Sequence, residues 1–177
     1  MHRLFVAVRP PAQIRDQLLD LMEGVPGAAW QDDDQLHLTL RFIGEVSRHR
    51  AEDLALALLG VRHPRFALTL AGAGAFERKG RTTSLWAGLS PGEPLKALHH
   101  KIDQVCQSIG LDPEGRAYTP HVTLARLGRQ AGPVWAWLSG AGALSSDAFA
   151  VDTFCLFESD LSPAGAIYSV VERYSLG

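Results

Sequence analysis

The tetrad His-x-Thr-Leu occurs twice in this chain, at positions 37–40 and again at 121–124, 84 residues further on. In a chain of this composition a recurrence of this kind is expected by chance only about once in a thousand sequences. Each copy lies in a segment where apolar and polar residues alternate, and helical periodicity precedes and follows it. The recurrence therefore predicts an internal duplication, with one copy of the tetrad in each of two similar lobes.

The hydrophobic pattern divides the rest of the chain into short strands and helices. Strands are predicted at 4–8, 36–43, 66–70, 83–89, 119–127, 149–157 and 167–174. Helices are predicted from Pro10-Pro11 to about 22, from Ser47 as N-cap to about 59, from 94 to 109, and near 134–138, with a Gly-rich basic loop at 72–81. This order indicates an α+β fold, a bilobal pseudo-twofold duplicate with two mostly antiparallel sheets backed by helices around a central cleft.

Composition places the chain among compact globular proteins, because 46% of its residues are hydrophobic and 20% are charged. With 177 residues it is expected to form one domain over 1–177. A net charge of −2 excludes a protein that coats nucleic acid, so any contact with a polynucleotide must be local. Cys106 and Cys155 lack the spacing of a disulfide framework or a zinc knuckle, and no segment predicts a signal peptide or a membrane span. The expected location is the cytoplasm.

The tetrads place chemistry on one face of each strand. Residues i and i+2 of a strand share a face, so His37 lies beside Thr39 and His121 beside Thr123 while the intervening side chains enter the core. An imidazole accepts or donates a proton near neutral pH, and a hydroxyl donates a hydrogen bond to a phosphate oxygen. Two such pairs facing one volume are typical of acid/base cleavage of a phosphodiester.

Two histidines are also metal ligands in many proteins, so a zinc or manganese site was the alternative. Catalytic zinc takes three protein ligands, and the faces that carry the two histidines offer Thr and Arg rather than Asp, Glu or Cys. The sequence therefore predicts a metal-independent site without a cofactor. The other five histidines show no such duplication and are excluded from the site.

Arginine is the best side chain for binding a phosphate, and each tetrad has one close by. Strict alternation puts Arg41 on the face of His37 and Thr39. The same alternation turns Arg126 away from His121, unless a bulge or the strand end reorients it. Both arginines are kept as candidate phosphate ligands.

Several segments together resemble the 2H phosphoesterase superfamily, in particular its RNA 2′,3′-cyclic phosphodiesterases, also called 2′-5′ RNA ligases. The resemblance covers essentially the whole chain and rests on the duplicated tetrad, the opening Arg3 to Ala7, and the stretches HLTLRFIGEV, PHVTLAR and FESDLSPAGAIYSVVERY. It implies a bilobal fold and metal-free opening of a 2′,3′-cyclic phosphate to a 2′-phosphate. It also implies that His37 is the proton donor to the departing 3′ oxygen and His121 the proton acceptor that activates water. Thr39 and Thr123 would hold phosphate oxygens, and the HVTLAR pattern favours Arg126 as a further contact.

The expected substrate is an RNA terminus that carries a 2′,3′-cyclic phosphate, with weak reverse joining of ends as a 2′-5′ ligase. One alternative is a phosphodiesterase for a small cyclic nucleotide or a 2′-5′ oligonucleotide. Another is a non-catalytic RNA- or nucleotide-binding module, against which the two complete His-Thr pairs argue. No obligate protein partner and no membrane contact are expected. Additional RNA contacts are predicted for the basic run 78–81 and for three possible base-stacking aromatics, Trp30, Phe76 and Tyr118.

Overall fold

A computed structural model describes residues 1–177 as nine strands, four α-helices and two 3-10 helices. The strands are β1 (His2–Val8), β2 (Ala28–Trp30), β3 (Leu38–Val46), β4 (Phe66–Arg78), β5 (Arg81–Ser90), β6 (His121–Leu127), β7 (Phe149–Val151), β8 (Thr153–Ser162) and β9 (Gly165–Ser175). The helices are α1 (Ala12–Leu19), α2 (Arg48–Ala57), α3 (Glu93–Ser108) and α4 (Trp135–Ala141), and the 3-10 helices are Asp33–Gln35 and Leu58–Gly60. No helix is long and apolar enough to cross a membrane.

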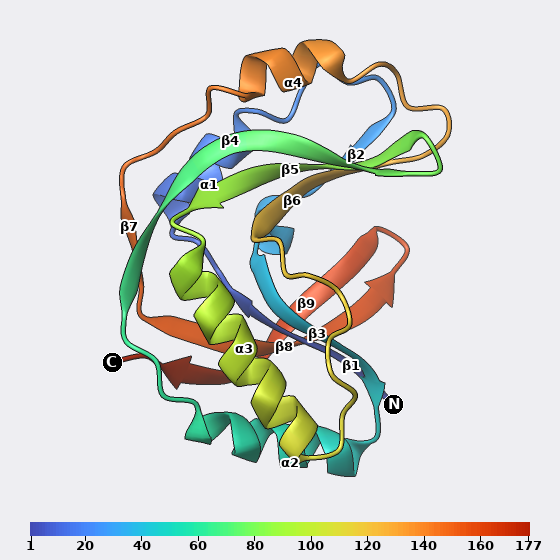
Figure 1. Ribbon diagram of the computed structural model, residues 1–177. Coiled ribbons are helices and arrows are strands. Elements are labelled where there is room, and N and C mark those ends of the chain that lie inside the picture. Colours follow the sequence, from blue (N-terminus) through green and yellow to red (C-terminus); the bar gives the residue numbers. More distant parts are fainter.

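All strand pairs are antiparallel, and the strand order is β7-β4-β5-β6-β3-β1-β8-β9, with β2 beside β6. The path falls into two halves, here called the β3 lobe (β1, β3, β8, β9) and the β6 lobe (β2, β4, β5, β6, β7). Only one residue pair, Leu38 with Val122, joins β3 to β6 (Figure 1). The same order outward from this junction, β3-β1-β8 and β6-β5-β4, gives the molecule its pseudo-twofold character. The predicted α+β fold of two similar, mostly antiparallel lobes is confirmed.

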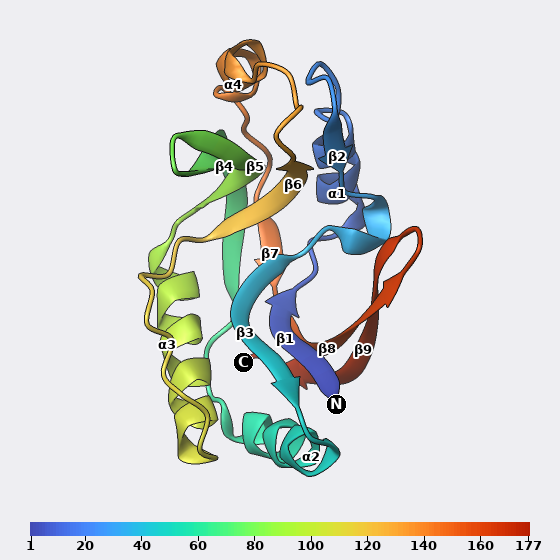
Figure 2. The same cartoon turned by 90° about the vertical axis from the view of Figure 1, so that its right-hand side faces the viewer.

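Two helices, α1 and α3, pack against the lobe opposite to the one whose strand precedes them in the sequence. Helix α3, which follows β5 of the β6 lobe, packs against β3 and α2 of the other lobe, as Figure 2 shows. Helix α1, which follows β1 of the β3 lobe, reaches the β6 lobe, where the side-chain amide of Gln17 donates to the Ser145 carbonyl at 2.6 Å. The segment after α1 continues this contact through the indole of Trp137, which donates to Leu21 at 2.8 Å. Neither half of the sequence therefore forms a lobe by itself.

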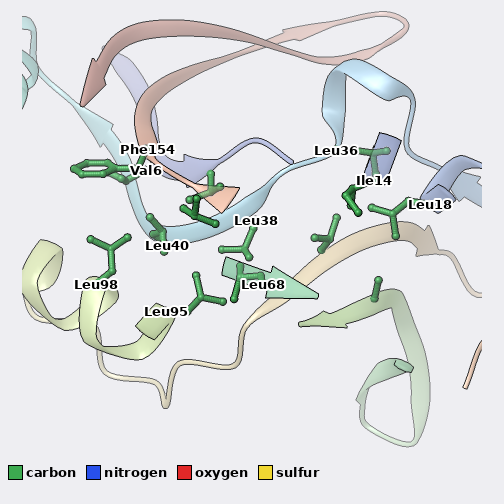
Figure 3. Packing of buried hydrophobic residues seen from close by; sticks show 14 of the residues in the cluster. Val6, Ile14, Leu18, Leu36, Leu38, Leu40, Leu68, Leu95, Leu98 and Phe154 are labelled. Atoms are coloured by element: carbon green, nitrogen blue, oxygen red, sulfur yellow. The ribbon is translucent and has the colours of Figure 1, made fainter. Parts of the chain in front are cut away.

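One apolar core extends through both lobes behind the junction. Helix α3 buries a stripe with helical spacing, formed by Leu95, Leu98, Ile102 and Cys106. It packs toward the inward side chains of β3, while Ile14 and Leu18 of α1 occupy the same core further along (Figure 3). Both tetrads contribute their apolar positions to this core, so their His and Thr positions are held on the opposite face of the sheet.

Two predicted segments have another form in the structure. The predicted loop 72–81 is instead the end of a β4–β5 hairpin, closed by Lys79 and Gly80 at φ 54° and 75°, values typical of a two-residue hairpin turn. Gly74 in this hairpin has a packing reason, because a Cβ there would lie 2.3 Å from the Trp86 ring. The predicted strand 149–157 is two strands, β7 and β8, which pair with β4 and β1 respectively. The remaining predicted strands and helices are present with shifted ends, whereas β2 and the 3-10 helix Asp33–Gln35 were not predicted.

Candidate active site

The single β3–β6 pair brings the two tetrads together. Leu38 and Val122 are 1% and 0% exposed and point into the core. One step along this antiparallel register, His37 lies opposite Thr123 and Thr39 lies opposite His121. All four side chains are half-buried on the face away from the core. The structure therefore gathers the four predicted His and Thr residues around the pseudo-twofold axis.

Both imidazoles are oriented by the same backbone contact. Nδ1 of His37 lies 2.7 Å from the Gln35 carbonyl, and Nδ1 of His121 lies 2.7 Å from the Thr119 carbonyl. A carbonyl only accepts hydrogen bonds, so Nδ1 carries the proton in each ring. The second nitrogen, Nε2, is left to accept a proton, or to donate one when the ring is protonated.

Aromatic rings enclose His37 on its own lobe. The imidazole stacks on Phe5 at 4.7 Å between ring centroids and meets the edge of Tyr168 at 5.0 Å. This burial lowers the pKa of His37 to about 4, and the charges of Arg9, Arg126 and His121 act in the same direction. The hydrogen bond to Gln35 opposes the shift without cancelling it. In the free protein His37 is therefore neutral at pH 7.

The surroundings of His121 are less cationic. Its ring meets Phe76 edge to face at 4.9 Å and lies 6.2 Å from Trp86. Burial lowers the pKa of His121, and the hydrogen bond to Thr119 again opposes the shift. Burial thus shifts both imidazoles toward the neutral, proton-accepting form, and a negative charge beside either ring would favour its protonation.

The carbonyl that orients His37 lies in a rigid turn. Gln35 ends the 3-10 helix, whose capping box joins it to Asp32 in both directions. The Arg9 guanidinium donates to three backbone carbonyls around this helix, those of Asp33, Asp34 and Leu36. The Gln35 side-chain amide also donates to Ala166 in the β8–β9 hairpin at 3.0 Å. The corresponding carbonyl at Thr119 lies in an irregular segment before β6.

The prediction that Arg41 shares the face of His37 and Thr39 is wrong. Strand β1 pairs Val6 with Arg41 and then Ala7 with Thr39, so Leu40 is an extra residue in a bulge. Arg41 is consequently turned inward and is 7% exposed. Its Nε donates to Asp103 at 2.9 Å, and its other nitrogens donate to the carbonyls of Phe42 and Asp112. Arg41 is a structural residue that joins β3 to α3.

A matching bulge reorients Arg126 toward the site. Strand β5 pairs Leu85 with Ala125 and then Trp86 with Thr123, which leaves Leu124 as the extra residue. Arg126 is exposed, and its charge lowers the pKa of His37, which places it within electrostatic range of that ring. The equivalent position on β3 is Phe42, which is 47% exposed and stacks on Phe5 at 6.0 Å. Sequence reasoning missed Phe42.

The three aromatics predicted as stacking platforms all have packing contacts within the protein. The Tyr118 hydroxyl donates to the Thr39 carbonyl at 2.8 Å, and its ring stacks on His99 at 4.3 Å. Trp30 packs on Trp137 at 6.0 Å. Phe76, which is half-buried, contacts His121. No group of three or more His, Cys, Asp or Glu residues is arranged to hold a metal ion.

Residues 5–163 match the family model of the 2′-5′ RNA ligase superfamily. The chain belongs to this superfamily. Among its relatives are two proteins named RNA 2′,3′-cyclic phosphodiesterase. The protein from Aeropyrum pernix is 33% identical over 90% of this chain and 91% of its own length. The protein from Escherichia coli is 31% identical over 98% of this chain and 96% of its own length.

Similar solved structures agree with this assignment. Escherichia coli LigT complexed with 3′-AMP superposes with a TM-score of 0.81 at 28% identity, over 99% of this chain and 98% of LigT. The crystal structure of a phosphoesterase gives a TM-score of 0.82 at 28% identity with the same coverage. The resemblance noted in the sequence is therefore confirmed at the level of family and fold.

Proposed function

We propose that this superfamily member hydrolyses 2′,3′-cyclic phosphate at RNA ends to a 2′-phosphomonoester, by two-histidine acid/base catalysis without a metal. The observation that carries the proposal is the matched pair of imidazoles, each with Nδ1 bonded to the backbone and Nε2 left for the substrate. The curated relatives named RNA 2′,3′-cyclic phosphodiesterase support the choice of substrate.

In the proposed step, the oxygen of a water molecule forms a bond to phosphorus while the bond from phosphorus to the 3′ oxygen breaks. Nε2 of His121 takes the proton of the attacking water, and Nε2 of His37 gives a proton to the departing 3′ oxygen. The negative phosphate beside His37 raises the pKa of that imidazole, offsetting the effect of burial and of Arg9 and Arg126. Charging of the acid is thus coupled to binding of the substrate.

The phosphate oxygens are assigned to Arg126 and to the hydroxyls of Thr39 and Thr123. Arg126 is exposed beside the site, and a guanidinium offers a phosphate several planar donors. The two hydroxyls lie on the same face as the histidines, one from each lobe. This arrangement surrounds the phosphate with donors that gain strength as negative charge accumulates in the transition state.

Phe42 favours an RNA end over a phosphodiester without a base. Its ring is 47% exposed, continues the stack of Phe5 and His37, and offers an apolar face to a nucleobase. The same groups would also run the reverse joining of ends, which we expect to be the minor direction in water.

The test is to incubate chelator-treated protein with an RNA that ends in a 2′,3′-cyclic phosphate and to identify the product. We expect a 2′-phosphomonoester, with kcat reduced roughly 10²-fold or more in His37→Ala and in His121→Ala. His100→Ala is the matched control, because His100 is exposed on α3. A 3′-phosphate product, activity that depends on added metal, or a near-normal rate in either histidine variant would refute the proposal.

A further inference from the structure

Four exposed basic residues gather at one end of the β6 lobe: Arg78, Lys79, Arg81 and Arg129. This group is called the basic lip below. Three of them form the tip of the β4–β5 hairpin, and Arg81 reaches across to the Leu127 carbonyl at 3.4 Å, close to Arg129. None of the four has an acidic partner, although seven basic side chains elsewhere, counting histidines, form ion pairs.

The one carboxylate beside the basic lip in the sequence is Glu77, which directly precedes Arg78 in β4. Residues 78–92, which contain β5, and residues 115–146, which contain β6 and α4, include no Asp or Glu, although the whole chain has a net charge of −2. The β8–β9 hairpin of the other lobe carries Glu158 and Asp160 instead. Positive charge is thus concentrated on one of two hairpins, both of which point to the right in Figure 1 and lie at opposite edges of the view in Figure 2.

The basic lip continues outward from the site. Arg126 lies opposite Ser84 on β5, and Arg81 begins that strand three residues earlier, ~10 Å away at the rise of a β-strand. His121, at the other end of β6, pairs with Gly88. The order along β5 and β6 is therefore His121, then Arg126, then the basic lip. The β3–β6 junction lies at the end of β6 that carries His121.

We propose that the basic lip binds the sugar-phosphate backbone of the RNA upstream of its cyclic end, so that this protein prefers oligonucleotides to mononucleotides. The inference rests on the proposed function, because it takes the terminal phosphate to lie between the histidines and Arg126. Exposed, unpaired Arg and Lys side chains suit phosphate contacts that carry no sequence information. A strand held in this way needs only a few contacts, which is consistent with the negative net charge of the whole chain.

The experiment compares kcat/KM on substrates of one, three and six nucleotides that end in a 2′,3′-cyclic phosphate, at several NaCl concentrations. The variant is Arg78→Gln/Arg129→Gln, and the matched control is Arg48→Gln/Lys96→Gln, whose exposed side chains lie on α2 and α3. For the wild-type protein we expect kcat/KM to rise about tenfold with length and to fall steeply with salt. The variant should lose this rise and keep the mononucleotide rate, and its salt slope should be smaller by about 1.4, or ~0.7 per lost contact.

Binding of a hexanucleotide that ends in a 3′-phosphate, followed by fluorescence anisotropy, tests the basic lip independently of catalysis. Weaker binding by the variant, with unchanged binding by the control, supports the inference even if no substrate is hydrolysed, a result that would refute only the proposed function. Equal rates on one and six nucleotides together with equal binding by the variant would overturn the inference and leave the proposed function intact. Equally tight binding of a poly-glutamate peptide would also overturn it, because the basic lip would then be a general surface for acidic partners.

Discussion

His37 and His121 have the same hydrogen-bond geometry but different electrostatic surroundings. Burial lowers the pKa of both, and only His37 also responds to Arg9, Arg126 and the other imidazole. Arg126, which is assigned to the phosphate, thus adds to the burial that keeps His37 neutral until the phosphate arrives. This coupling makes the protonation of the acid depend on the substrate rather than on the bulk pH alone.

The pH profiles should show this coupling. Catalysis needs one charged and one neutral imidazole, and in the free protein both pKa values lie below 6.5, that of His37 at about 4. The profile of kcat/KM, which reports the free protein, should therefore be bell-shaped with its maximum below pH 6.5. The profile of kcat should peak at higher pH, because bound phosphate raises the pKa of the imidazoles. Coincident maxima above pH 7 would contradict this account.

Two arginine variants should have opposite effects. Arg126→Met removes an exposed cation beside the site, so activity should fall by about 10²-fold, the pKa of His37 should rise in NMR titration, and stability should hardly change. Arg41→Met leaves Asp103, whose side chain is 12% exposed, without its ion-pair partner, so unfolding should become easier by about 3–5 kcal/mol. The folded fraction of Arg41→Met should remain active. A stable but inactive Arg41→Met protein would return Arg41 to the site.

The histidines and threonines of the site could be predicted from sequence. The orientations of Arg41 and Arg126 could not, because each depends on a β-bulge. In β6 the signal was readable, since the consecutive apolar residues Leu124 and Ala125 reset the alternation and leave Arg126 outside. In β3 the bulge at Leu40 shifts the alternation in the same way, so that Arg41 points inward and Phe42 outward. An arginine at an inward position and a phenylalanine at an outward one reverse the usual pattern, so alternation alone gave the wrong face.

At the scale of elements, the 3-10 helix Asp33–Gln35 positions the His37 ring. Gln35 contributes the carbonyl that orients the ring, and its side chain fixes the turn through Asp32 and the β8–β9 hairpin. Gln35→Ala keeps the carbonyl but removes these restraints, so we expect kcat to fall about tenfold with KM little changed. Asp34→Ala, at a side chain that is 97% exposed, is the matched control on the same turn.

The Nδ1 proton of His37 provides a second measurement for this element. A rigid carbonyl acceptor should slow its exchange with water in the wild-type protein, and Gln35→Ala should accelerate the exchange while leaving the Nδ1 proton of His121 unaffected. Equal exchange at His37 in both proteins would mean that the turn does not position the ring.

The β4–β5 hairpin shows why some element boundaries escaped prediction. Gly72, Gly74 and Gly80 indicated a loop, but only Gly80, at φ 75°, lies in the turn, whereas Gly72, at φ 72°, lies at the register shift between Leu70 and Ala73. Gly74 lies within β4 beneath the indole of Trp86, a requirement set by a cross-strand neighbour that local sequence does not reveal. Local patterns were sufficient for a helix with a side-chain cap, such as α2 after Ser47, and for a helix with a clear apolar stripe, such as α3.

At the scale of the molecule, the exchange of α1 and α3 makes each lobe depend on both halves of the chain. The sequence predicted two similar lobes but gave no sign of this exchange, since periodicity shows which face of a helix is buried and not which sheet covers it. Helix α3 shares a core with β3, and α1 contacts the β6 lobe. The two lobes should therefore unfold together.

Unfolding in urea should therefore show one transition. Far-UV circular dichroism reports both lobes, and tryptophan fluorescence reports the β6 lobe, because Trp30, Trp86, Trp135 and Trp137 all lie there. We expect the two signals to give the same midpoint. Two separated midpoints would show that the lobes are independent and would contradict the prediction of one domain over residues 1–177.

The division of labour between the two histidines is the central claim, and a change of leaving group tests it most directly. Sulfur in place of the departing 3′ oxygen leaves without prior protonation, because a thiol has a pKa of about 8.5. On this substrate His37→Ala should recover most of the wild-type rate, whereas His121→Ala, which lacks the base for water, should remain slow. Recovery of His121→Ala instead, or no difference between the two variants, would contradict the assignment of His37 as acid and His121 as base.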